Sequence, residues 1–251
     1  MNVFQSLFLG FLQGVTEFLP VSSSGHLLLA RELLGIPGGS MVYDLMLHLG
    51  SLAAVIVTLR RDILALFRPP FRGLFLLALA TLPAAVAGLL LSDAIERAFG
   101  GGEMLFATFA ATALLLAAAS KMPARSSPVG VKQALAMGCM QAVALLPGLS
   151  RSGSVLFGGL AAGGERTAVA RFAFLMSIPV IAGGALVSLA GGESGLAVGW
   201  WETLCGMAAA FAGGMVSMGA LTRVVARARF RPFVRYMLAL ALMTFCIYRV
   251  A

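Results

Sequence analysis

The stretch that decides the fold runs from Gly10 to His26 and reads GFLQGVTEFLPVSSSGH. It places a carboxylate, a proline, three consecutive serines and a histidine inside an otherwise apolar run. The whole chain of 251 residues is 60% hydrophobic and only 11% charged. Soluble domains contain about 25% charged residues, so the composition indicates a polytopic membrane protein. Polar groups buried in such a protein are costly unless they are paired.

Six apolar segments approach the length of about 20 residues that a spanning helix needs. They are 41–59, 73–92, 104–120, 167–189, 200–221 and 236–250. Most basic residues lie in three alternate connections, 60–72, 121–132 and 223–235. By the positive-inside rule these connections are cytoplasmic, and both termini then lie on the outer side. The net charge of +8 is therefore attributed to membrane orientation and not to nucleic-acid binding.

Two further stretches, 1–35 and 133–164, are apolar but broken near the middle by proline, glycine and serine. If either stretch crossed the membrane, the charged connections would no longer alternate between the two sides. Both are therefore predicted to be re-entrant helical hairpins. The non-helical backbone at their tips is tolerated inside a membrane only where protein or a water-filled cavity surrounds it.

The two broken stretches resemble each other at a constant offset that is close to half the chain. The first contains Gly10, Gln13, Ser24 and Gly25, and the second contains Gly138, Gln141, Ser152 and Gly153. Three predicted spans follow each hairpin, so the two halves have opposite orientations. The sequence therefore predicts an all-α polytopic membrane protein with one domain over 1–251. The predicted architecture has six transmembrane helices and two re-entrant hairpins. Its two halves, 1–128 and 129–251, are related as an inverted repeat.

The first hairpin contains residues suited to acid–base and anion chemistry. Gln13 and Glu17 are four residues apart and share one helix face. An ionisable residue inside a membrane is a functional candidate by default, although Glu17 could instead cap a helix or pair with an arginine. An anion-binding helix N-terminus is predicted at Ser22, Ser23, Ser24 and Gly25. Capping alone would also explain these serines.

His26 lies in the first turn of the following helix and is expected to face whatever that N-terminus binds. An acid–base role is predicted for it, with a structural hydrogen bond as the alternative. In the second hairpin, Arg151 is the only charged residue between Lys132 and Glu165. A guanidinium there requires a phosphate or a carboxylate partner. The two partners are compatible, because a Glu17–Arg151 salt bridge in the resting protein could open when phosphate arrives. The neighbours of the arginine are Ser150, Ser152 and Gly153.

Two other pairs of polar residues remain open to more than one interpretation. Asp44 and His48 lie four residues apart in the first predicted span, where they either line a cavity or bond to neighbours. Arg166 and Arg171 follow the second hairpin, where headgroup contact, helix capping and substrate contact explain them about equally.

The motifs QGVTEFLPVSSSGH (13–26) and PGLSRSG (147–153) resemble the two signatures of the undecaprenyl-diphosphate phosphatases, the bacitracin-resistance family. The segments 43–51, 60–62 and 171–179 are similar to further blocks of that family. The resemblance implies an enzyme of the bacterial cytoplasmic membrane that removes the terminal phosphate of undecaprenyl diphosphate. This reaction recycles the lipid carrier of peptidoglycan and other cell-wall glycan synthesis. It also implies a site open to the outer side, often a homodimer, and a divalent cation, Mg²⁺ or Ca²⁺.

The resemblance also assigns roles to individual residues. It makes Glu17 the essential acid and a candidate metal ligand, Ser23 the proposed nucleophile and Arg151 the essential arginine. His26 matches the histidine of the motif. Val155 stands where the family usually has threonine, which leaves Ser154 as a neighbouring hydroxyl. Substrate contacts are expected from Gln13, Ser22, Ser24, Gly25, Ser150, Ser152 and Gly153. Gln13 stands at the position where the first signature of the family has its first acidic residue.

A transporter or flippase of a phosphorylated polyprenyl lipid is the alternative function. Inverted repeats with broken helices are common among transporters, and Gln13 and Val155 would then be weakened catalytic positions. Release of phosphate by the purified protein distinguishes the two functions, because a transporter without hydrolase activity releases none.

Overall fold

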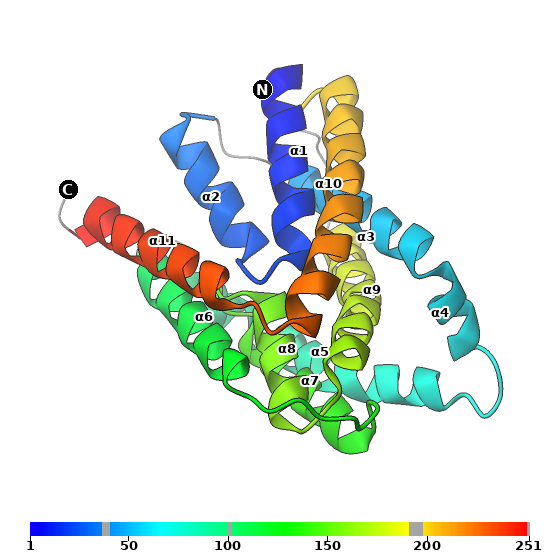
Figure 1. Cartoon of the computed structure of the whole chain (residues 1–251). Helices are drawn as coiled ribbons and strands as arrows, with labels where there is room; N and C mark the ends of the chain where they lie inside the picture. Colours follow the sequence, from blue (N-terminus) through cyan, green and yellow to red (C-terminus); the bar gives the residue numbers. More distant parts are fainter. Residues whose placement is uncertain (37–40, 100–101, 191–197, 250–251) are drawn as a thin grey trace.

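The computed structural model describes residues 1–36, 41–99, 102–190 and 198–249, and this part of the chain forms eleven α-helices (Figure 1). It contains no strand, and Ser127 and Gly164 form an isolated β-bridge. The predicted all-α class is confirmed. The helices are α1 (Val3–Phe18), α2 (Ser23–Leu33), α3 (Met41–Thr58), α4 (Arg60–Leu66), α5 (Arg72–Phe99), α6 (Leu105–Ser120), α7 (Val131–Val143), α8 (Arg151–Ala161), α9 (Arg166–Ala190), α10 (Trp200–Ala226) and α11 (Arg231–Arg249).

Each predicted span overlaps one helix, in the order α3, α5, α6, α9, α10 and α11. Four of them, α5, α9, α10 and α11, contain a stretch long and apolar enough to cross a membrane. The chain bends by 80° between α3 and α4, so this pair is a fifth candidate only as one broken span. Helix α6 is apolar but has 16 residues. The described residues therefore contain four or five candidate spans, where the sequence predicted six.

Two helical hairpins occupy the stretches that were predicted to be broken. The first tip, residues 19–22, joins α1 to α2, and the second tip, residues 144–150, joins α7 to α8. Ser22 has a φ of +69° and Gly148 a φ of +84°. Both tips therefore use backbone conformations that residues other than glycine rarely adopt. The proline of each hairpin lies in its tip, where a missing N–H does not interrupt a helix.

Each hairpin packs closely against a long helix. Figure 1 shows α1 and α10 side by side, and these two helices form an extensive contact. A Cβ on Gly14 would lie 2.1 Å from the carbonyl oxygen of Ala210 in α10. A Cβ on Gly138 in α7 would lie 2.4 Å from the carbonyl oxygen of Ala80 in α5. Glycine permits this close approach of helix backbones in membrane proteins.

Both tips are fixed in the same part of the hydrophobic core. Phe18 before the first tip and Val21 within it belong to one buried cluster with Val155 and Leu156 in α8, which follows the second tip. The rings of Phe18 and Phe174 meet edge to face, with their centroids 5.7 Å apart. Aromatic pairs of this geometry add to the free energy of simple burial. The core therefore positions the two tips relative to each other.

Helix boundaries recur at the offset noted in the sequence. Helix α2 begins at Ser23 and α8 begins at Arg151, and each has 11 residues. The starts of α5 at Arg72 and of α10 at Trp200 are separated by the same offset. Equivalent helices thus follow one another in the same order in two parts of the chain.

Candidate active site

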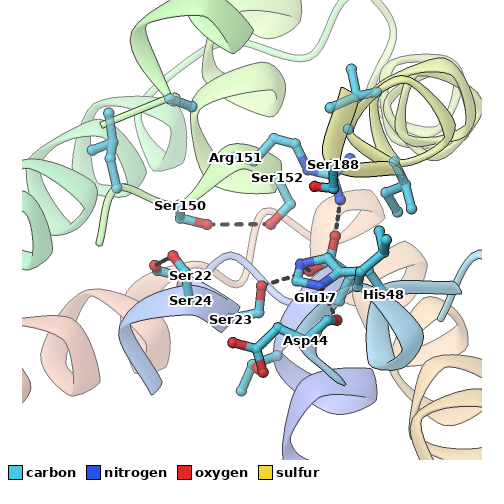
Figure 2. A pocket seen from close by; sticks show the side chains of 17 residues that line it. Glu17, Ser22, Ser23, Ser24, Asp44, His48, Ser150, Arg151, Ser152 and Ser188 are labelled. Carbon is cyan, nitrogen blue, oxygen red and sulfur yellow. Dashed lines mark hydrogen bonds and ion pairs between the residues drawn. The ribbon is translucent and has the colours of Figure 1, made fainter. Parts of the chain in front are cut away.

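A cavity of about 340 Å³ lies between the two tips and the helices α3 and α9 (Figure 2). Leu45, Val180 and Ile181 form part of its apolar wall. The polar wall joins residues that are far apart in the sequence. It includes these predicted site residues: Glu17, Ser22, Ser23, Ser24, Ser150, Arg151 and Ser152.

Glu17 is a buried carboxylate in this wall, with only 4% of its side chain exposed. Its Oε2 accepts hydrogen bonds from Ser23 Oγ at 2.6 Å and from Gln13 Nε2 at 2.9 Å. Its Oε1 accepts a hydrogen bond from Nη2 of Arg151, and the two residues form a salt bridge. A buried charge requires such paired and hydrogen-bonded partners. The Glu17–Arg151 salt bridge considered in the sequence is therefore formed.

The first turns of α2 and α8 share one hydrogen-bond pattern. Ser22 Oγ accepts from the Gly25 N–H at 3.4 Å, and Ser150 Oγ accepts from the Gly153 N–H at 3.2 Å. Each of these serines also contacts the hydroxyl of the serine two residues later, at 3.5 Å and 3.3 Å. All four serines line the cavity, and Figure 2 shows the Ser22–Ser24 pair below the Ser150–Ser152 pair. Both helix N-termini end at the cavity, an arrangement that favours a bound anion.

The two tips contact each other directly. Ser152 Oγ donates a hydrogen bond to the carbonyl oxygen of Leu19 at 2.9 Å. A Cβ on Gly153 would lie 3.5 Å from the Cβ of Pro20, which is ordinary van der Waals contact. Arg151 and Glu17 thus meet because two loops that are far apart in the sequence pack against each other.

Asp44 and His48 both line the cavity and also bond to neighbours, so both sequence interpretations hold. Asp44 accepts from both terminal nitrogens of Arg31, in a bidentate pair. His48 Nδ1 lies 2.8 Å from the carbonyl oxygen of Asp44 and therefore donates to it. The other ring nitrogen, Nε2, lies 3.7 Å from Glu17 Oε2. The spacing of four residues between Asp44 and His48 was the signal in the sequence, although it did not identify Glu17 as the partner.

His26 is not part of the cavity wall, contrary to the expectation that it faces the anion. The residue is 7% exposed. Its Nδ1 lies 2.7 Å from the carbonyl oxygen of Ser22, and its Nε2 lies 2.7 Å from the Tyr236 hydroxyl. Tyr236 lies on α11, and nothing in the sequence pointed to it. The predicted substrate contacts Gln13, Gly25 and Gly153 also lie outside the wall, beside residues that line it.

Arg166 and Arg171 contact other parts of the protein. Arg166 Nη2 donates to the carbonyl oxygen of Met122 at 3.0 Å. Arg171 Nη1 lies 3.6 Å from Asp62 Oδ1, and its side chain is 64% exposed. Neither arginine lines the cavity. Protein contacts therefore account for both residues without a role in substrate binding.

Val155, at the position where threonine was expected, lines a smaller cavity behind the Glu17–Arg151 pair. Gln141 and Ser177 lie in the same wall. Ser154 is fully buried but lines neither this cavity nor the large one. Its hydroxyl therefore does not replace the missing threonine hydroxyl.

The side chains alone do not form a preassembled site for the predicted divalent cation in the part of the chain that the structure describes. No group of three histidine, cysteine, aspartate or glutamate residues that could hold a metal occurs within residues 1–36, 41–99, 102–190 and 198–249. Glu17, the candidate ligand, already accepts hydrogen bonds from three donors, one of them a guanidinium. Magnesium is usually bound through one or two carboxylates together with substrate phosphates. Support by Mg²⁺ or Ca²⁺ therefore stays a prediction that would require the substrate's own oxygens.

Comparison with known proteins places these features in a family. The family model described as "Bacitracin resistance protein BacA" matches residues 6–243. An undecaprenyl-diphosphatase of Idiomarina loihiensis is 35% identical, over 99% of this chain and 100% of its own length. One of Geobacter sulfurreducens is 38% identical over 95% of both chains. One of Carboxydothermus hydrogenoformans is 40% identical over 75% of this chain and 74% of its own. Since the match includes both hairpin tips and nearly all of the chain, this protein belongs to the BacA family of bacitracin resistance proteins.

Proposed function

We propose that this chain is an undecaprenyl-diphosphatase, which hydrolyses undecaprenyl diphosphate to undecaprenyl phosphate and inorganic phosphate. The reaction returns the lipid carrier to peptidoglycan and other cell-wall glycan synthesis. Relatives with this name match the chain over nearly its whole length. One observation in the site carries the proposal: a serine hydroxyl is hydrogen-bonded to a buried carboxylate that is paired with an arginine.

The geometry around Ser23 supports a role as nucleophile. Ser23 Oγ donates to Glu17 Oε2 at 2.6 Å, so the carboxylate is placed to accept the proton as the oxygen attacks. The attack forms a bond between Ser23 Oγ and the terminal phosphorus. It breaks the bond between that phosphorus and the bridging oxygen of the diphosphate. Undecaprenyl phosphate leaves, and water then hydrolyses the phosphoserine. A water molecule activated by Glu17 that attacks the phosphorus directly is the alternative route.

Arg151 neutralises the phosphate charge in this proposal. Phosphoryl transfer depends mainly on positioning and on charge stabilisation, and a guanidinium matches phosphate oxygens in a bidentate manner. Arg151 leaves Glu17 when the diphosphate enters, which frees the carboxylate to act as a base. The serines at the N-termini of α2 and α8 hold the remaining phosphate oxygens.

His48 is better placed than His26 to exchange a proton with Glu17. Its Nε2 lies 3.7 Å from Glu17 Oε2, and its side chain is 30% exposed in the cavity wall. His26 has both ring nitrogens engaged with Ser22 and Tyr236. We therefore assign the proton relay to Glu17 and His48.

The membrane arrangement we propose is an inverted repeat with two re-entrant hairpins and six membrane-crossing segments. The recurrence of the helix starts Ser23 and Arg151 at the offset of the sequence repeat supports it. The first part of α9 contacts two connections that are predicted to be cytoplasmic. Arg171 contacts Asp62 in one of them, and Arg166 contacts Met122 in the other. In this arrangement both termini and the cavity face the outer side of the cytoplasmic membrane. A homodimer is part of the same proposal.

Release of inorganic phosphate from undecaprenyl diphosphate by the purified protein in detergent tests the function. Arg151→Ala removes the guanidinium from the cavity and should abolish release. Arg171→Ala is a matched control, because it removes a guanidinium that lies outside the cavity. If the wild-type protein releases no phosphate in detergent but moves the lipid between the leaflets of reconstituted vesicles, the transporter alternative is correct.

A further inference from the structure

The hydrogen bonds of His26 fix the state of its ring. The Ser22 carbonyl accepts hydrogen bonds only, so His26 Nδ1, at 2.7 Å, carries the proton and donates it. In the neutral ring Nε2 is then an acceptor, and the Tyr236 hydroxyl at 2.7 Å donates to it. The two rings also stack, with centroids 5.6 Å apart and an interplanar angle of 22°. A continuous chain of contacts thus runs from α11 through His26 to the first tip.

The end point of this chain is a residue with an unusual backbone. Ser22 has a φ of +69°, is the N-cap of α2 and is 4% exposed. Residues in such sparsely populated conformations persist only where the surroundings hold them, and they cluster at functional sites. Ser22 directly precedes Ser23, whose hydroxyl contacts Glu17. The conformation of Ser22 therefore sets where the Ser23 hydroxyl lies.

The second tip is held in a comparable way. The backbone N–H of Ser150, the N-cap of α8, donates to Thr112 Oγ1 on α6 at 3.0 Å. In each hairpin the N-cap serine is thus tied through a backbone group to a helix outside the hairpin. Figure 1 shows those two helices, α6 and α11, side by side. Among the described residues, no side chain of α11 bonds to Ser22 directly. His26 instead links the first tip to Tyr236 on α11.

We propose that Tyr236 and His26 act together as an anchor that positions the first tip, and that neither contacts the phosphate. Both are positioning residues: Tyr236 orients the His26 ring, and His26 holds the Ser22 carbonyl. The proposal rests on the phosphatase function proposed above. It differs from an acid–base role for His26, because a positioning residue affects the rate without contributing a titrating group.

The experiment measures kcat, KM and the pH profile of phosphate release for four variants in detergent. Tyr236→Phe removes the hydroxyl and keeps the stacked ring. Tyr248→Phe is its matched control, because Tyr248 also joins α11 to α2, through Glu32 at the opposite end of α2 from the tip. His26→Asn keeps a donor that can reach the Ser22 carbonyl, whereas His26→Ala removes it.

We expect Tyr236→Phe to lower kcat about tenfold with little change in KM, since small misplacement of a reacting group reduces the rate strongly. Tyr248→Phe should match the wild type. His26→Asn should retain at least about tenfold more activity than His26→Ala, with a pH profile of wild-type shape.

Three results would overturn the anchor. They are a Tyr236→Phe variant equal to the wild type, a His26→Asn variant no better than His26→Ala, or the loss of one limb of the pH profile in His26→Asn. Failure of the wild-type protein to release phosphate would instead refute the phosphatase function, so the two failures are distinguishable. Because Tyr236→Phe keeps the ring and its packing, the test does not depend on whether His26→Ala folds.

Discussion

At the residue scale, the site is a buried ion pair whose partners come from the two hairpin tips. Glu17 has a donor for each oxygen only because Arg151, Ser23 and Gln13 converge on it. Removal of one partner from a buried pair usually costs about 3–5 kcal/mol, because the other charge is left uncompensated. The groups proposed for catalysis therefore also contribute to the structure of the resting site.

Ser23→Ala tests the serine nucleophile. The variant should lose at least about 100-fold in phosphate release, since the hydroxyl that Glu17 accepts from is absent. Acid quenching of the wild-type protein with radiolabelled substrate should trap a phosphoserine at position 23. Ser126→Ala is the control, because Ser126 is an exposed serine that does not line the cavity. A fully active Ser23→Ala would establish direct attack by water.

At the element scale, glycine decides how closely each hairpin approaches the helix behind it. The Gly14 backbone lies against the Ala210 carbonyl with no room for a side chain. The sequence predicted both hairpins and their broken tips, since proline, glycine and serine interrupt the apolar pattern there. It did not predict the bend of 80° between α3 and α4, because Arg60, Arg61 and Asp62 mark only a charged connection there and do not show that a second helix begins at once. The direction of His26 was also unpredictable, since Tyr236 is 210 residues away and lies in no motif.

Gly14→Ala should destabilise the protein by about 1–3 kcal/mol, the usual cost of an overpacked methyl group. A fall in the thermal unfolding temperature in detergent is the measurement. Gly183→Ala in α9 is the control, because a Cβ there meets nothing within 4 Å. That substitution should be neutral or stabilise the helix by up to about 1 kcal/mol. Equal unfolding temperatures for Gly14→Ala and the wild type would contradict the close contact of α1 with α10.

At the scale of the whole molecule, the site exists because two helical hairpins that are far apart in the sequence present their tips to each other. The repeat in the sequence predicted two related hairpins, and the contact between Ser152 and Leu19 brings their tips together. The number of complete spans was less predictable, because α6 has 16 residues and α3 counts as a candidate only together with α4, across the bend. Hydropathy reports the length of an apolar run but not whether the helix continues straight past its end.

The proposed orientation predicts which surfaces are accessible from outside the cell. In a background without the three native cysteines, Leu34→Cys should react with a membrane-impermeant maleimide in intact spheroplasts. Ala124→Cys should react only after permeabilisation, because its loop is predicted to be cytoplasmic. Both positions are exposed in the structure. The reverse labelling pattern would invert the topology and place the cavity on the cytoplasmic side.

The most direct test of the account is the rate of phosphate release from undecaprenyl diphosphate by purified wild-type protein and by Glu17→Gln. The substitution keeps the shape of the side chain and removes the charge that joins Ser23 to Arg151. We predict rapid release by the wild type and a loss of at least about 100-fold in Glu17→Gln. Wild-type rates in Glu17→Gln would contradict the central claim, because the cavity between the two tips would then not be the active site.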